Sequence, residues 1–336
     1  MEVKLSAIDL LKVSNIPEYR EDKIRNKAYV SYGDNNKWNY YLFGLYKDVA
    51  TLNTLVNGCA DYTAGNGVKD DYEVNSKGLL ASELVRKLAF DRFLYGGFAF
   101  QVLRNYMGQV AEIYYIPFGN IRSNESNTEF WYSKDWSVWG AKAIKYPAFN
   151  DSPASIFYFK GYSDYTYPIC PFNGAITSCE IERRINNFHL NEISNNFNGS
   201  AVINFNNGVP NDEQKAEIER LINSKFSGDD NAGRILIAYN DSKDNAVTIE
   251  KLAQDNLDDR YKDLAERSRD QIFTSFRATP SLFGLSTSTG FNAEEYKSQF
   301  EIFNRCVIRP VQLEIQKAFK RLGKELNIIP FTLQYD

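Results

Sequence analysis

The sequence contains one histidine, His189, among 336 residues. This scarcity excludes metal centres built from several histidines, and any Ser-His or Cys-His catalysis would have to use this residue. His189 lies between Phe188 and Leu190 in a helical pattern, so we interpret it as a structural histidine. No GxxxxGK[ST], GxSxG or HExxH motif occurs. A Walker ATPase, an α/β-hydrolase and a zincin are therefore disfavoured.

Cysteine is also sparse, with four residues at Cys59, Cys170, Cys179 and Cys306. Their spacing matches no CxxC zinc pattern. We favour free, mostly buried thiols in a reducing compartment, with a Cys170–Cys179 disulfide as the alternative. Residues 1–22 contain too short an apolar stretch for a signal peptide, and no apolar run reaches the roughly 18 residues of a membrane span. We therefore expect no membrane association.

An excess of positive charge is missing as well. The 39 Lys and Arg residues against 43 Asp and Glu give a formal net charge of −4, so we expect no tight static binding of nucleic-acid phosphates. Clustered carboxylates can hold the metal of a nuclease, and three acidic pairs occur. Adjacent acids point in different directions, however, and we interpret the pairs as solvated surface. The pairs are Asp70-Asp71, Asp229-Asp230 and Asp258-Asp259.

The composition is that of a typical folded protein, with 43% hydrophobic and 15% aromatic residues. The polar residues up to about Lys37 indicate an arm. Helical spacing follows over 42–64 and after Ser82, which we take as a helix cap. Residues 97–116 predict a hairpin, and short alternating strands follow up to Tyr167. Their aromatics could form a stacking platform for single strands, but sheet core is the preferred interpretation.

The pattern changes near Pro168. An amphipathic helix is predicted over 177–197, and strands at 201–205, 234–239 and 246–252 with a helix from Asn211 form a small α+β insertion. A strongly charged helix with a narrow apolar stripe follows from about Leu257. The small polar segment 285–292 leads to a helix over about 293–323, which Pro310 should kink. A short strand is predicted at the end.

Four passages in this order carry a resemblance. They are FLYGGFAFQVLRNYMGQVAEIYYIP, the corner Phe197-Asn198-Gly199, IFTSFRATPSLFGL and GFNAEEYKSQFEIFNRCVIRPVQLEIQKAFKRL. Over roughly residues 40–325 the chain resembles the tailed-phage portal proteins of the HK97-like and PBSX-like families. One departure is that the family's Val-Pro-Pro reads Ala278-Thr279-Pro280-Ser281 here, with one proline.

The resemblance implies an α+β portal fold with a two-helix stem, assembled as a ring oligomer. It implies the following regions: an N-terminal arm (1–40), a wing (41–175), a first stem helix (176–199), a clip (200–253), a second stem helix (254–278), a tunnel loop (279–291), a long kinked wing helix (292–325) and a tail (326–336). So short a tail leaves the family's helical crown absent or rudimentary.

The function implied is that of a non-enzymatic subunit in a dodecameric ring at one capsid vertex, without cofactor or metal. Double-stranded DNA would pass through this ring during packaging and ejection. The major capsid protein, the terminase large subunit and head–tail adaptor proteins would be its partners. The protein would reside in the virion after assembly in the host cytoplasm. The alternatives are a metal-dependent nuclease or nucleotidyl enzyme using an Asp pair, and a different head–tail adaptor ring.

Site residues follow from the same resemblance. DNA-facing candidates in the tunnel loop are Ser286, Thr287, Ser288, Thr289 and Asn292. Channel candidates on the second stem helix are Asp258, Arg260, Lys262, Arg267 and Arg269. Docking candidates in the clip are Asn206, Asn207, Asp212, Lys215, Asp229 and Asp230. Pro310 is the expected helix kink.

Overall fold

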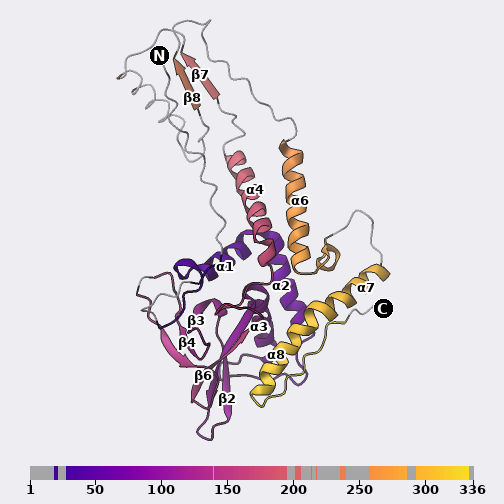
Figure 1. Cartoon of the computed structure of the whole chain (residues 1–336). Helices are drawn as coiled ribbons and strands as arrows, with labels where there is room; N and C mark the ends of the chain where they lie inside the picture. The colour runs from indigo at the N-terminus through magenta and orange to yellow at the C-terminus, as the bar shows by residue number, and fades with distance from the viewer. Residues whose placement is uncertain are drawn as a thin grey trace. The chain divides into compact units, whose positions relative to one another are not determined.

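The computed structural model describes residues 19–21, 28–138, 140–194, 201–205, 213, 217, 235–239, 257–285 and 293–332. The chain divides into two compact units, one made of residues 1–180 and 267–336 and the other of residues 181–266. No helix among the described residues is long and apolar enough to span a bilayer. Helices and strands both contribute to the first unit (Figure 1), which agrees with the predicted α+β class.

Three helices pack together at the start of the first unit: α1 (Trp38–Asp48), α2 (Ala50–Ala64) and α3 (Ala81–Tyr95). The single helix predicted over 42–64 is two helices, because Val49 is extended between them while its side chain remains buried. Ser82 is not the cap of α3. The helix begins one residue earlier, and the Glu83 carboxylate accepts the Leu80 N–H at 3.2 Å.

Two three-stranded antiparallel sheets follow. The first has the order β2-β1-β6, from β1 (Gly97–Arg104), β2 (Val110–Tyr115) and β6 (Ala154–Lys160). The second joins β3 (Ile121–Ser123), β4 (Glu129–Tyr132) and β5 (Ile144–Pro147). The predicted hairpin is therefore confirmed. Phe100 and Phe157 stack across β1 and β6 at 4.8 Å and are buried, which supports sheet core over a stacking platform for these rings.

Residues 28–37 are packed, which corrects the expectation of an arm as far as Lys37. The Val30 N–H donates to Ser123 O at 2.9 Å, and Tyr32 stacks on Tyr167 with ring centroids 4.3 Å apart. A short helical turn, η1 (Asp34–Asn36), then leads into α1. The segment is polar in composition, but the side chains of Val30 and Tyr32 are buried.

Arg122 of β3 joins this segment to the second sheet. It is fully buried, and its guanidinium donates to backbone and amide oxygens of Asn36, Asn39, Gly119 and Ile121. No carboxylate among the described residues pairs with it. Burial lowers the pKa of Arg122, and the guanidinium depends on this shell of oxygens for its stabilisation.

The C-terminal part of the first unit consists of α7 (Ala293–Phe303), a π-helical turn η6 (Asn304–Ile308) and α8 (Arg309–Arg321). The long helix predicted over 293–323 is thus interrupted directly before Pro310, which has no N–H to continue the α-helical hydrogen bonds. The predicted final strand is reduced to a single bridge between Ile328 and Val68. Backbone hydrogen bonds from Asn66 to Ile329 and from Lys69 to Asn327 hold this end against the segment that follows α2.

Three short helical turns complete the described elements of this unit: η2 (Phe118–Asn120), η3 (Asn173–Ala175) and η5 (Pro280–Phe283). The helices α4 (Ile176–Ser194) and α6 (Leu257–Ser275) each run from one unit into the other. In the second unit, β7 (Ala201–Phe205) and β8 (Ile235–Tyr239) form a parallel pair. The predicted strand at 246–252 lies outside the described residues, as does most of the helix after Asn211.

Candidate channel surface and loop base

The residues before and after segment 286–292 are held by a closely packed support, which we call the loop base. It consists of residues 279–285, Gln299 and Tyr62 of α2. The Tyr62 hydroxyl donates to Leu282 O at 2.8 Å. Phe283 lies between Tyr62 at 5.9 Å and Phe273 at 5.9 Å, measured between ring centroids. These contacts join α2, α6 and η5, so the chain leaves for residue 286 from a fixed position.

Gly58 of α2 makes this packing possible. A Cβ atom at this position would lie 2.4 Å from Cε1 of the Phe283 ring, closer than real contacts allow. The absence of a side chain at Gly58 lets η5 approach the helix closely. A larger residue would displace Phe283 and, with it, the start of residues 286–292.

The polar side of the loop base connects the two ends of residues 286–292. The hydroxyls of Thr279 and Ser281 donate to Gln299 Oε1 at 2.9 and 2.7 Å. The Gln299 amide in turn donates to Glu295 at 2.9 Å. Since Thr279 precedes the segment and Gln299 follows it, the same side chain orients both ends. The five predicted DNA-facing residues lie outside the described residues: Ser286, Thr287, Ser288, Thr289 and Asn292.

The helix α6, which we predicted to be the second stem helix, carries a balanced set of charges over its described side chains. Over residues 261–275 the exposed charged side chains are the bases Lys262, Arg267 and Arg269 and the acids Asp263, Glu266 and Asp270, three of each. The predicted channel candidates Asp258 and Arg260 lie in the first turn, and their side chains are outside the described part of the chain. The opposite face carries the buried Ser268 and Ile272.

The geometry of α6 adds a feature that our choice of mainly basic channel candidates missed. The acids at 263, 266 and 270 recur with helical spacing and share the face most distant from Ser268 and Ile272. Lys262 and Arg269 flank this acidic row on one side, and Arg267 flanks it on the other. The signal was present in the sequence as the three- and four-residue spacing of the acids.

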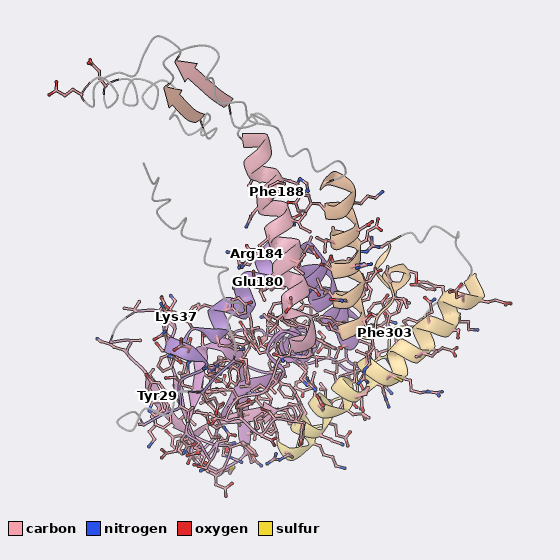
Figure 2. The ribbon with its side chains drawn as sticks, turned by 45° about the horizontal axis from the view of Figure 1, so that its top comes forward. Tyr29, Lys37, Glu180, Arg184, Phe188 and Phe303 are labelled. Atoms are coloured by element: carbon pink, nitrogen blue, oxygen red, sulfur yellow. The ribbon has the colours of Figure 1, made fainter. Side chains whose placement is uncertain are left out.

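The helix α4, which we predicted to be the first stem helix, contacts α6 through different residues in each unit. In the first unit Ser178 donates to the Gln271 side chain. In the second unit Phe188 packs against Tyr261 with ring centroids 4.9 Å apart, and His189 makes an edge contact with the same ring at 5.9 Å. Figure 2 shows Glu180, Arg184 and Phe188 along α4. His189 thus takes part in packing, as its helical context indicated.

The clip candidates lie outside the described residues: Asn206, Asn207, Asp212, Lys215, Asp229 and Asp230. Of the acidic pairs, Asp71 accepts hydrogen bonds from the Ser82 N–H and hydroxyl, which orders the start of α3. Within the described ranges, no group of three or more His, Cys, Asp or Glu residues is arranged to hold a metal ion. None of the four cysteines forms a disulfide; Cys59, Cys170 and Cys179 are buried and Cys306 is exposed.

Comparison with known proteins identifies the family. The model of the phage portal protein family matches residues 75–324. No curated protein matches the sequence. A chain in the virion of a native gene transfer agent particle has a similar fold, with 16% identity, a TM-score of 0.57, and coverage of 86% of this chain and 83% of that one.

Two further structures share the fold. A chain in the neck of a native gene transfer agent particle with C12 symmetry has 16% identity, a TM-score of 0.55, and coverage of 85% and 82%. An HK97-family phage portal protein from Corynebacterium diphtheriae has 12% identity, a TM-score of 0.50, and coverage of 85% and 94%. The family match spans well over half of the sequence, and the fold agrees with it along most of the chain. The chain belongs to the phage portal protein family.

Proposed function

We propose that this portal subunit assembles into a dodecameric ring at one capsid vertex, through which double-stranded DNA is packaged and ejected. Twelve copies are suggested by the similar chain in a neck with C12 symmetry. In a closed ring every subunit offers the same surface to the channel, so weak contacts from one copy are repeated around the DNA.

The observation that carries the proposal is the loop base. Tyr62, Phe283 and Gln299 fix both ends of residues 286–292, while the segment between them contains only small, polar or aromatic residues. We assign Ser286, Thr287, Ser288, Thr289 and Asn292 to transient contacts with DNA phosphates. Hydroxyl and amide groups donate hydrogen bonds to phosphates without the strong salt-dependent attraction of lysine or arginine.

The exposed face of α6 supports the same function. Three bases and three acids over residues 261–275 give this part of the helix no net charge. A surface of this kind binds a moving polyanion weakly, because phosphates attracted by Arg267 or Arg269 are repelled by the acidic row. We assign Lys262, Arg267 and Arg269, with Asp258 and Arg260, to the channel side of the stem.

The remaining assignments concern partners. We assign Asn206, Asn207, Asp212, Lys215, Asp229 and Asp230 of the clip to docking of the terminase large subunit and then of head–tail adaptors, and we expect the wing to contact the major capsid protein. The subunit would perform no chemistry of its own, and the terminase would hydrolyse ATP. Assembly would take place in the host cytoplasm before the ring enters the virion.

Deletion of Ser286–Gly290 in the full chain tests the role of the loop. Negative-stain microscopy should still show rings with a central hole, because the loop base is retained, and packaged DNA per particle should fall by at least tenfold. Replacement of the same five residues by Gly-Ser-Gly-Ser-Gly keeps the length and separates reach from chemistry. Normal packaging by the deletion variant would refute the role of the loop. Persistent monomers of the wild-type chain under all assembly conditions would refute the ring.

A further inference from the structure

The outward face of η6 and α8 carries a row of basic side chains. Arg305 and Arg309 are four residues apart, and Lys317 and Lys320 are three apart, so the four share one side of this continuous helical element. All four are exposed. Figure 1 shows α7 and α8 along one edge of the first unit. We call these four residues the basic row.

The π-helical turn η6 keeps this outward face continuous. Phe303 and Ile308 are five residues apart, and both are buried. In a regular α-helix, five residues would place two side chains about 140° apart around the axis. The wider turn brings Ile308 back to the side of Phe303. Arg305 within the turn and Arg309 directly after it therefore both point away from the core.

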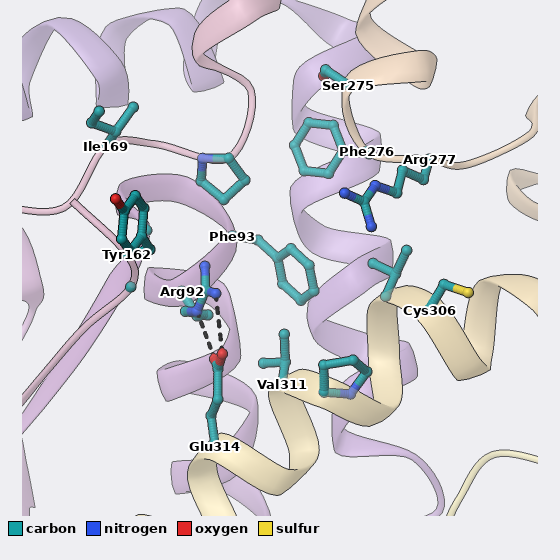
Figure 3. Close-up of a pocket in the computed structure, with 15 residues that line it drawn as sticks. Arg92, Phe93, Tyr162, Ile169, Ser275, Phe276, Arg277, Cys306, Val311 and Glu314 are labelled. Carbon is teal, nitrogen blue, oxygen red and sulfur yellow. Dashed lines mark hydrogen bonds and ion pairs between the residues drawn. The ribbon is translucent and has the colours of Figure 1, made fainter.

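Acidic side chains do not neutralise the basic row. The one acid of α8, Glu314, is half-buried and pairs with Arg92 of α3 at 2.7 Å (Figure 3). Between residues 305 and 320 no acid is exposed, and among the described residues no carboxylate pairs with the row. Arg321 is not part of it, since its guanidinium lies over the Phe157 ring at 5.2 Å. The formal net charge of −4 thus hides a face of the opposite sign.

The apolar side chains on this face favour a nucleic acid over a protein as the partner. Ile302 is 62% and Leu313 is 39% exposed, and they lie eleven residues apart, or about 16 Å along the axis. A stable protein interface has a contiguous apolar centre, whereas single exposed apolar residues are ordinary on a protein surface. A row of guanidinium and ammonium groups without acids is the pattern that binds phosphates.

The length of the basic row suits a duplex. From Arg305 to Lys320 the helical element rises by about 22 Å. Each strand of duplex DNA carries a phosphate for every ~3.4 Å of the axis, so a stretch of this length presents roughly six phosphates on one strand. Four long, flexible basic side chains can therefore each reach a different phosphate.

We propose that the basic row binds the phosphates of double-stranded DNA. The choice of double-stranded DNA rests on the function proposed above, whereas the preference for phosphate follows from the row itself. Phe300 and Phe303 pack on the opposite side of α7 against Tyr62 of the loop base, with ring centroids 5.9 and 5.7 Å apart. The row holds DNA against the outside of the subunit, and this attachment is separate from the transient contacts proposed for residues 286–292.

The salt dependence of binding tests this proposal. Fluorescence anisotropy with a labelled duplex would give the affinity of the purified full chain between 50 and 200 mM NaCl. Each phosphate contact adds about 0.9 to the slope of log K against log[NaCl], so removing the row should reduce the slope by about 3.6 per bound subunit. Over this range of salt, four contacts correspond to a roughly 150-fold change in affinity. The variant combines Arg305→Gln, Arg309→Gln, Lys317→Gln and Lys320→Gln.

A matched control removes the same amount of charge from exposed lysines elsewhere in the first unit. It combines Lys37→Gln, Lys47→Gln, Lys134→Gln and Lys142→Gln. The control should keep the wild-type slope, and so should the double variant Arg305→Lys, Arg309→Lys, which keeps the charge of the row. An equal loss of slope in the control would overturn the proposal, because net charge alone would then determine binding. Tighter binding of polyglutamate than of the duplex would overturn it in favour of an acidic protein.

Negative-stain microscopy of the same samples separates the basic row from the ring. Rings formed by a row variant whose slope is unchanged would refute the row and leave the proposed ring intact. Monomers of the wild-type chain that still lose DNA binding with the row would refute the ring alone. If the row variant loses its rings but keeps its slope, the face is a contact between subunits and the proposal is wrong.

Discussion

A buried carboxyl should make this protein lose stability as the pH rises. Asp91 of α3 is 1% exposed, and its side chain accepts the Phe118 N–H at 3.0 Å. Burial raises the pKa of Asp91 to about 8, although hydrogen bonds from Phe118 and Tyr115 oppose this shift. The protonated form therefore predominates in the folded protein at neutral pH.

The sign and size of the effect follow from linkage. An unfolded aspartate has a pKa of about 3.9, so between this value and about 8 the folded state binds the proton more tightly. The stabilisation is complete below the unfolded pKa and is lost as the pH rises through the folded one. At about 1.36 kcal/mol per pH unit, the wild-type protein should lose roughly 3–4 kcal/mol of unfolding free energy from this group between pH 5 and pH 8.

Asp91→Asn isolates this contribution, because the amide oxygen can still accept from Phe118 while the side chain cannot ionise. Urea unfolding at pH 5, 6, 7 and 8, followed by tryptophan fluorescence, gives the free energy for both proteins. The unfolding free energy of the variant minus that of the wild type should increase by roughly 3–4 kcal/mol between pH 5 and pH 8. Asp151→Asn, at a fully exposed side chain, is the matched control and should parallel the wild type. Parallel curves for Asp91→Asn and wild type would refute the reasoning.

Two further predictions concern packing. Arg122→Met should lower the unfolding free energy by about 3–5 kcal/mol, since it leaves several buried oxygens without donors, whereas Arg86→Met at the exposed ion pair with Asp61 should cost less than about 1 kcal/mol. Similar losses in urea unfolding for the two variants would count against the buried network. Gly58→Ala should destabilise by about 1–3 kcal/mol and speed hydrogen exchange at the amides of residues 282–285, because its Cβ meets Phe283. Gly44→Ala, which has open space around its Cβ, should be neutral or stabilising by up to about 1 kcal/mol, and unchanged exchange in Gly58→Ala would contradict the proposed support of the loop.

The elements that the sequence predicted correctly are those with local signals. The hairpin of β1 and β2 shows alternating apolar residues around a Gly108 turn, and α4 and α6 show helical spacing. The packing of residues 28–37 could not be predicted in this way. It depends on Arg122, whose hydrogen-bond partner Asn36 is 86 residues away, and no periodicity in a polar segment reveals such a contact.

The loop base was hidden for the same reason. The polar segment at 285–292 is visible in the sequence. The residue that holds its preceding turn is not, because Tyr62 and its hydrogen-bond partner Leu282 are 220 residues apart. In the sequence, Gly58 resembles any glycine that weakens a helix. Its role follows only from the Phe283 ring, which packs where a Cβ atom would lie. The acidic row on α6, in contrast, can be predicted from the spacing of Asp263, Glu266 and Asp270 alone.

In the proposed channel, the loop base and the charge balance of residues 261–275 of α6 would meet two opposite physical requirements. A segment that touches DNA must keep its position under load, which needs rigid ends, and Tyr62 with Gln299 supplies them. In the proposed channel the groups that touch DNA must also release it at each step, which needs weak contacts. Hydroxyl groups at positions 286–289, and the equal numbers of exposed acids and bases over residues 261–275 of α6, would satisfy this requirement. If lysines occupied positions 286–289, every copy in a ring would add phosphate contacts, and resistance to sliding would grow with the number of subunits. Firm attachment to the subunit and weak attachment to DNA are therefore separate properties, placed on separate residues.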